Sequence, residues 1–174
     1  MATSTTVLNK PGIIYPNDFA LITLTLLTAV TTMDMKTILV ELSMNEDLFA
    51  SVSSGYLMVV DSSGYIEKLQ LTGNEFLRVS LAKTTDRANL YDKIFRVYKV
   101  AKREPENEGN TETYALYFCS EEMVLSEQYK VAKSYKGKDI AFNVKDILTN
   151  YLKVDSSKIG VIESTYGTYD FIVP

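Results

Sequence analysis

The sequence predicts a mainly β protein, an antiparallel β-barrel or sandwich with a long hairpin and one or two helices. Two glycine-containing turns separate three short apolar segments within residues 54–82, as in consecutive strands. Leu77, Val79 and Leu81 alternate with polar residues, the period of two of a half-buried strand. A third observation is the uncharged segment Phe19–Met33, whose five threonines favour strand structure.

The first of these regions predicts a three-stranded meander, with strands Tyr56–Asp61, Tyr65–Leu71 and Glu75–Ala82. Asp61-Ser62-Ser63-Gly64 and Thr72-Gly73-Asn74 supply the turns, because Asp and Asn cap the local backbone and Gly accepts positive φ.

The segment Phe19–Met33 predicts one long strand or two consecutive strands. Its 15 uncharged residues are fewer than the ~20 that cross a bilayer, and no basic region of a secretory signal precedes them. We expect Ile22, Leu24 and Leu26 on one face and Thr23 and Thr25 on the other. An exposed strand of this kind aggregates, so a neighbouring strand or another subunit should cover it.

The remaining strands of the barrel flank the meander. Thr37–Met44 should be a strand with Ile38, Val40, Leu42 and Met44 on one face, followed by a turn or short helix at Asn45–Val52. Thr84–Tyr91 is polar and is predicted to be a connection. Strands at Asp92–Arg103 and Thr111–Cys119 should form a long hairpin across the exposed loop Glu104–Asn110. We expect Phe95 and Val97 on one face of the first hairpin strand, and Ile94, Tyr98 and Val100 on the other.

The two ends of the chain differ from this β pattern. Residues 1–17 carry Pro11 and Pro16 and are predicted to be an extended arm, for which a loosely ordered terminus is the alternative. Ser120-Glu121-Glu122 resembles a helix start. A second helix, capped by Asp139 or Asn143, should place on one face Ile140, Val144, Ile147, Leu148 and Tyr151. Short strands at Lys158–Ser164 and Tyr169–Val173 should follow. The expected domains are 1–17, 18–120 and 121–174.

Composition excludes several kinds of chemistry. The 174 residues include no histidine, so the chain alone cannot supply a Ser-His-Asp or Cys-His arrangement. The single cysteine, Cys119, allows no intrachain disulfide and is expected to be buried. The net charge of −4 argues against binding nucleic acid by neutralising phosphates. No metal-ligand spacing is present, and we predict no cofactor, no metal and no enzymatic activity.

Several segments follow in an order that resembles the baseplate hub proteins of T-even-like contractile-tail phages. They are Leu39-Val40-Glu41-Leu42, Glu46-Asp47-Leu48-Phe49, Gly-Tyr-Leu-Met-Val-Val-Asp at 55–61, Gly73-Asn74-Glu75, Tyr114–Phe118 with Ser120-Glu121-Glu122, and Ser134-Tyr135-Lys136-Gly137. The resemblance spans roughly residues 36–152. Gly-Asn-Glu alone would occur by chance in many proteins, so the succession carries the likeness.

This resemblance implies a tail-tube-like barrel in a virion baseplate that assembles in the host cytoplasm. Family members carry two such barrels and form three-fold hubs, which join the six-fold tail tube or its initiator to the central spike, inside the baseplate wedge proteins. DNA passes through the channel without specific binding. This chain stops at Pro174, so it is either a fragment or a reduced relative with only the first barrel. If the chain were complete, a six-copy ring would replace the trimer.

Two other functions remain open. One is a tail tube or tube-initiator protein, and the other is a carbohydrate-active tail-tip module. The second would need paired carboxylates, for which Asp61, Glu67, Glu121 and Glu122 are available. Ser134–Lys138 is a weak candidate phosphate loop with one glycine. Candidate interface residues for a ring are Ile13, Ile14, Tyr15, Leu24, Leu26, Tyr98, Tyr114 and Tyr135.

Overall fold

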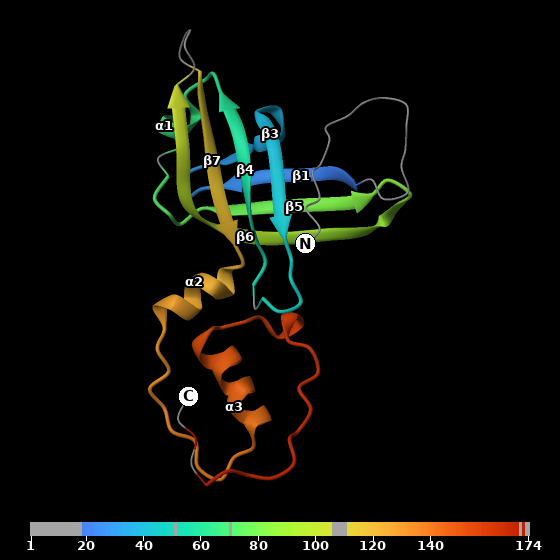
Figure 1. Ribbon diagram of the computed structural model, residues 1–174, viewed down its shortest axis with the longest axis vertical. Helices are drawn as coiled ribbons and strands as arrows, with labels where there is room; N and C mark the ends of the chain where they lie inside the picture. The colour runs from blue at the N-terminus through green and yellow to red at the C-terminus, as the bar shows by residue number, and fades with distance from the viewer. Residues whose placement is uncertain (1–18, 51, 70, 106–110, 171, 173–174) are drawn as a thin grey trace. The chain divides into compact units, whose positions relative to one another are not determined.

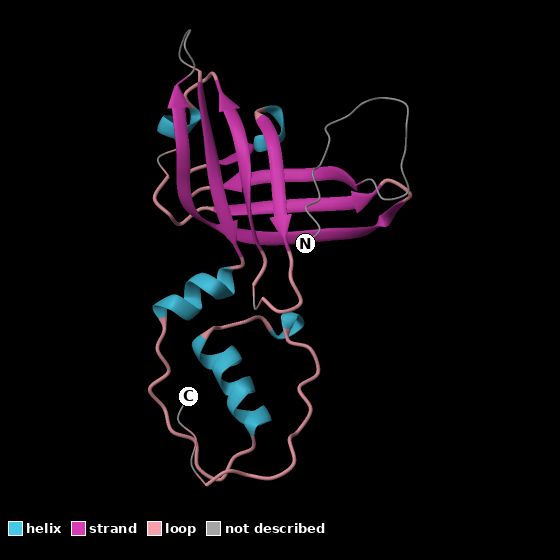
Figure 2. Ribbon diagram, in the orientation of Figure 1, coloured by secondary structure: helices cyan, strands magenta, loops and turns pink. Residues whose placement is uncertain are grey.

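The protein is described by a computed structural model, which covers residues 19–50, 52–69, 71–105, 111–170 and 172. The chain divides into two compact units, Met1–Glu121 and Glu122–Pro174. Figure 2 shows that strands dominate the first unit and that helices and loops make up the second. Among the described residues, no helix is long and apolar enough to cross a membrane.

The first unit is built on a seven-stranded antiparallel sheet, which confirms the prediction of a mainly β fold with minor α structure. The strand order is β2-β1-β5-β6-β7-β4-β3. The strands are β1 (Phe19–Leu27), β2 (Thr32–Asp34), β3 (Leu39–Asn45), β4 (Ser54–Asp61), β5 (Phe76–Lys83), β6 (Asp86–Pro105) and β7 (Glu112–Cys119).

The 20-residue strand β6 connects the two halves of the sheet. Its first half pairs with β5 and its second half with β7, and Arg96 is paired with both Phe76 and Cys119. The sheet curls along β6, so that β1 and β5 run across the direction of β3, β4 and β7 (Figure 1). The predicted pairing of Asp92–Arg103 with Thr111–Cys119 is confirmed.

The connection predicted at Thr84–Tyr91 is wrong, because β6 begins at Asp86 and its residues Leu90 and Tyr91 pair with Ala82 and Leu81. The side chains at this end of the strand are mostly polar and exposed, so the sequence shows no alternation of apolar and polar residues there. Pro105 ends β6, and residues 106–110 of the predicted loop lie outside the described part of the chain.

The concave side of the sheet holds one hydrophobic core. The rings of Phe95 and Phe118 meet there with centroids 5.0 Å apart. Leu24 and Leu26 face it from β1, as predicted. The other fully buried apolar residues include Leu57, Val59, Leu77, Val79, Val97, Tyr114 and Leu116.

The predicted meander is wrong, because β4 and β5 are not neighbours in the sheet. The predicted strand Tyr65–Leu71 is replaced by a short helix, α1 (Tyr65–Lys68). The carboxylate of Asp61 accepts hydrogen bonds from the backbone N–H groups of Ser63 (2.9 Å) and Ile66 (3.1 Å). Gly64 has φ of 66°, so the chain leaves β4 through a capped helical turn and does not reverse directly into a strand.

Two β-bulges change which side chains face the core. The β1–β5 register shifts between Leu21 and Thr23, which leaves Ile22 38% exposed and corrects its predicted place beside Leu24. The β3–β4 register shifts between Leu39 and Glu41, which leaves Val40 49% exposed although it was expected beside Leu42. One extra residue on one strand reverses the alternation, so a strict period of two fails at both places.

The uncharged segment 19–33 contributes two strands, β1 and β2, joined by a turn at Thr28–Thr31. The predicted strand Thr37–Met44 begins later, at Leu39, because the 3₁₀-helix η1 (Met35–Thr37) precedes it. Asp34 starts that helix by accepting a hydrogen bond from the N–H of Lys36 (2.9 Å).

The second unit contains α2 (Glu121–Gln128), α3 (Ile140–Asp146) and one π-helical turn, η2 (Ile147–Tyr151). Helix α2 begins at Glu121, one residue before the start of the second unit. Both predicted helices are therefore confirmed, and Asp139 caps α3 by accepting a bond from Phe142 N–H (2.9 Å). The predicted strand Lys158–Ser164 is wrong, since that region contains the 3₁₀-helix η3 (Ser156–Lys158) and irregular backbone. Of the expected strand Tyr169–Val173, Tyr169 and Ile172 form isolated bridges with Lys138 and Tyr135.

Candidate subunit interface

The eight interface candidates lie in three different settings. Ile13, Ile14 and Tyr15 fall outside the described residues. Leu24, Leu26, Tyr114 and Tyr135 are at most 3% exposed, so they are packed within their own chain and cannot contact a partner directly. Tyr98 is 51% exposed and keeps a surface position. The apolar character that singled out the buried four is explained by folding of the monomer.

Tyr98 belongs to a cluster of three tyrosines on the outer side of β4, β7 and β6. Its ring centroid is 6.4 Å from that of Tyr117, which is 5.7 Å from that of Tyr56. The Lys99 ammonium lies 5.4 Å from the Tyr117 centroid. Such amphipathic rings suit a contact surface, since they offer large area with little conformational entropy to lose.

The tyrosines differ in their polar partners. The Tyr56 hydroxyl donates to Glu41 (2.7 Å), and this bond raises the pKa of Tyr56 above its usual value. Burial raises the pKa of Tyr98, with smaller contributions from Cys119 and Tyr117. Cys119 is itself buried, as predicted, and burial raises the pKa of its thiol. The thiol is therefore protonated and covered, not a poised nucleophile.

The sheet presents unpaired strand edges. β3 is the last strand at one end of the sheet order. At the other end, β2 pairs only with Thr25–Leu27, so among the described residues the first part of β1 has a strand on its β5 side and none on the opposite side. Unpaired N–H and C=O groups at such edges are templates for pairing with another chain.

The loop between β3 and β4 displays two apolar side chains that the sequence interpretation did not select. Leu48 is 93% and Phe49 95% exposed. The Asp47 carboxylate accepts from the N–H of Phe49 (2.9 Å) and closes the turn. The sequence contains a signal for such a surface loop, since two apolar residues directly follow two acidic ones. The exposure of Leu48 and Phe49 could not be predicted from it, because that exposure depends on how the loop leaves the sheet.

Glu46 anchors this loop to β6. Its carboxylate accepts from Tyr91 (2.5 Å), Lys93 (2.8 Å) and Ser53 (3.1 Å). The bonds from Lys93 and Tyr91 lower the pKa of Glu46 below its usual value, so it stays ionised at neutral pH. The loop is thus fixed at its base while its tip is open to solvent.

In the second unit, α3 is incompletely covered. Ile140, Phe142 and Val144 are 40%, 44% and 41% exposed. Asn143 is 95% buried, and neither its side-chain oxygen nor its nitrogen has a hydrogen-bond partner among the described residues. A helix with apolar residues on opposite sides and little cover of its own is typical of a contact element.

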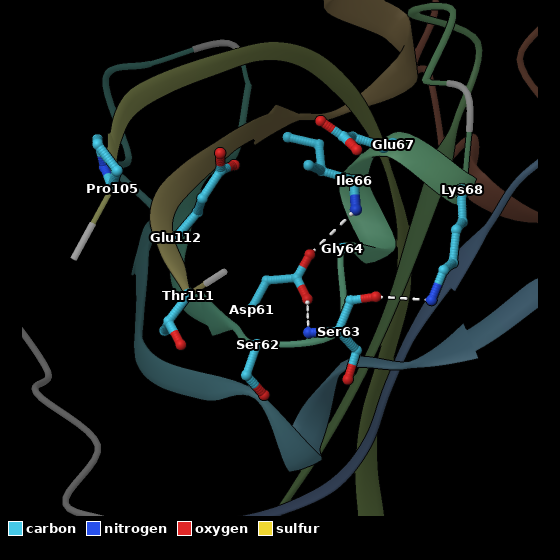
Figure 3. A pocket seen from close by; sticks show the side chains of 10 residues that line it. All are labelled: Asp61, Ser62, Ser63, Gly64, Ile66, Glu67, Lys68, Pro105, Thr111 and Glu112. Atoms are coloured by element: carbon cyan, nitrogen blue, oxygen red, sulfur yellow. Dashed lines mark hydrogen bonds between the residues drawn. The ribbon is translucent and has the colours of Figure 1, made fainter. Parts of the chain in front are cut away.

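A cavity of about 600 Å³ lies between the end of β4, α1 and the facing ends of β6 and β7. Figure 3 shows the Asp61 carboxylate in its centre, with Glu67 and Glu112 to one side. Asp61 is held by backbone N–H groups. Arg103 bonds both Glu112 (2.6 Å) and Glu67 (3.2 Å), so the acidic groups are paired with a cation.

These bonds give the three carboxylates of the cavity a structural role: Asp61 caps a turn, and Glu67 and Glu112 share one cation. No cluster of potential metal ligands occurs among the described residues. The candidate phosphate loop Ser134–Lys138 includes Tyr135, which forms a backbone bridge with Ile172. Its single glycine, Gly137, has φ of 64° and serves as a turn.

Comparison with known proteins returned no family model that matches this chain. A search of curated proteins returned no match either. The described residues form a mainly β chain with open sheet edges and exposed apolar side chains.

Proposed function

We propose that this chain is a structural subunit that assembles with copies of itself into a closed ring in a contractile phage tail. In this proposal it acts as the baseplate hub, which joins the tail tube to the central spike and lines the DNA channel. The observation that carries the proposal is the open antiparallel sheet, whose β3 edge and initial β1 edge have no neighbouring strand among the described residues. Edge pairing between copies would satisfy these backbone groups.

Two further features support an assembly role. Large apolar side chains are exposed in the loop at Leu48 and Phe49 and at Tyr98 on the sheet. The net charge of −4 would let DNA pass through a ring without being held. The resemblance over residues 36–152 names the kind of ring, and the virion location follows from it alone.

The proposal is tested by the size of the purified protein. Sedimentation and negative-stain electron microscopy should show closed rings of three or six copies. A chain that stays monomeric at high concentration, or that hydrolyses cell-wall polymer, would contradict the assembly role.

The edge contact itself is tested with Val40→Lys. Val40 is 49% exposed on the edge strand β3, so a lysine there folds but opposes strand addition. The rings should dissociate while the circular dichroism spectrum is unchanged. Val30→Lys, in the β1–β2 turn with Val30 85% exposed, is the matched control and should leave the rings intact.

A tail tube or tube-initiator protein is the second candidate. The same open sheet would serve a tube, in which rings stack on one another. Electron microscopy distinguishes the two, since a tube protein forms long stacks and a hub forms single rings.

A further inference from the structure

We infer that the Glu46–Ala50 loop of one copy docks on an aromatic–lysine patch in the second unit of another copy. The patch consists of the exposed side chains of Lys138 and Phe142, and the buried ring of Tyr135 supports Phe142 from within the same chain. This inference deepens the proposed ring assembly and rests on it for the number of copies. A loop of one copy that meets a different surface of the next copy makes a head-to-tail contact. Head-to-tail contacts generate rings when the rotation closes.

The loop has the properties of an inserted contact. Phe49 and Leu48 are almost fully exposed, although they are among the most apolar residues of the chain. Glu46 holds the base of the loop through three hydrogen bonds, and Asp47 closes its turn. A preorganised loop loses little conformational entropy when it binds, so two apolar side chains suffice for a hot spot.

The patch offers one exposed aromatic ring, that of Phe142 on α3, beside the ammonium group of Lys138, which precedes the helix. The Phe142 ring is 44% exposed and meets Tyr135 edge-on, with centroids 6.5 Å apart. The Lys138 ammonium lies 4.7 Å from the Phe142 centroid. An aromatic ring placed against Phe142 would form an offset or edge contact worth ~0.5–1.5 kcal/mol beyond its buried area.

Charge complementarity favours the Glu46–Ala50 loop as the occupant of the patch, and in the proposed ring that loop belongs to a second copy. The loop carries Glu46 and Asp47, whereas residues 129–145 contain five lysines and one aspartate. Within the described part of the chain, neither Asp47 nor Lys138 forms an ion pair. Docking Phe49 on Phe142 would bring these two charges of opposite sign to the same rim, where complementary charges fix partner and register.

Cross-linking tests the contact without relying on rings. Phe49→Cys and Phe142→Cys are prepared as separate proteins and mixed under mild oxidation, with the native thiol Cys119 buried and unreactive. A disulfide-linked heterodimer that forms faster than either homodimer is expected. Phe49→Cys mixed with Val161→Cys is the control, since Val161 is 93% exposed in the same unit but outside the patch. Equal rates for both mixtures would overturn the inference.

Charge exchange supplies the second test. Asp47→Lys and Lys138→Asp should each weaken self-association about tenfold in sedimentation equilibrium. The double variant should recover the part of the loss that comes from charge, but not the part that comes from the lost bond between Asp47 and the Phe49 N–H. Wild-type rings that persist unchanged in both single variants would overturn this contact and leave the ring proposal standing. Absence of wild-type rings, with the specific heterodimer still formed, would overturn the ring and keep the contact.

Discussion

The ring of Phe118 on β7 lies directly against Gly55 on β4. A Cβ atom at residue 55 would stand 2.7 Å from Cζ of Phe118 and 2.2 Å from the backbone oxygen of Ser43. Gly55 therefore lets three strands approach across one position, with Phe118 filling the space that a side chain would need. Phe118 in turn packs on Phe95 at the centre of the core.

Gly55→Ala should destabilise the protein, by about 1–3 kcal/mol or more, because the backbone oxygen of Ser43 cannot move aside as a flexible side chain can. Chemical denaturation monitored by circular dichroism measures the loss. Gly160→Ala is the control, since no heavy atom lies within 4 Å of its added Cβ, and it should be neutral or slightly stabilising. Equal stability of the two variants would contradict the close approach.

The bulge in β1 predicts unequal costs at neighbouring leucine and isoleucine positions. Leu24 is fully buried and Ile22 is 38% exposed, although a strict alternation puts them on one face. Leu24→Ala should cost about 2–5 kcal/mol of unfolding free energy and Ile22→Ala less than about 1.5 kcal/mol. Similar losses in denaturant titrations would mean that the register shift is absent.

Local pattern and long-range pairing contribute differently to what the sequence predicts. The alternation of Leu77 and Val79 identified a half-buried strand correctly, because the period of two is a local property. The predicted strand order was wrong, because the residues of Tyr56–Asp61 do not indicate which strands pair with this segment. It pairs with β7 and β3 and not with the next strand along the chain. The bulges at Ile22 and Val40 were missed because one inserted residue leaves no compositional mark.

The interface candidates failed for a related physical reason. Tyr114 and Leu26 are apolar residues on strands, and such residues fill a core as well as an interface. The exposed pair Leu48–Phe49 lies in a loop whose sequence has no periodicity. The base of this loop is fixed by the bond between Glu46 and Tyr91, which are 45 residues apart in sequence, and a local pattern does not reveal that bond or the exposure of Leu48 and Phe49.

The buried thiol of Cys119 predicts slow labelling. Since the residue is 1% exposed and burial raises the pKa of its thiol, the native protein should react with Ellman's reagent only as fast as it opens. In denaturant the single thiol should react at once. Rapid, complete labelling of the folded protein would show that this end of β7 is open.

The ion pair between Arg78 and Asp92 predicts a pH dependence of stability in the acid range. Arg78 donates to both oxygens of Asp92 (3.1 and 2.7 Å), and the Ser80 hydroxyl donates as well (2.6 Å). The bond from Arg78 is the largest cause that lowers the pKa of Asp92, from its usual 3.8 to about 2. The folded state therefore binds the proton more weakly than the unfolded state.

The contribution of Asp92 should be fully present above about pH 4 and should be lost as the pH falls through about 2. Both side chains are more than a third exposed, so solvent screening limits the effect to about 1 kcal/mol or less. Asp92→Asn should lower stability at pH 7, and its difference from wild type should shrink toward pH 2, as measured by urea titrations. Asp170→Asn on the second unit is the control. A constant difference across that range would mean that the Arg78 pair does not bias the ionisation of Asp92.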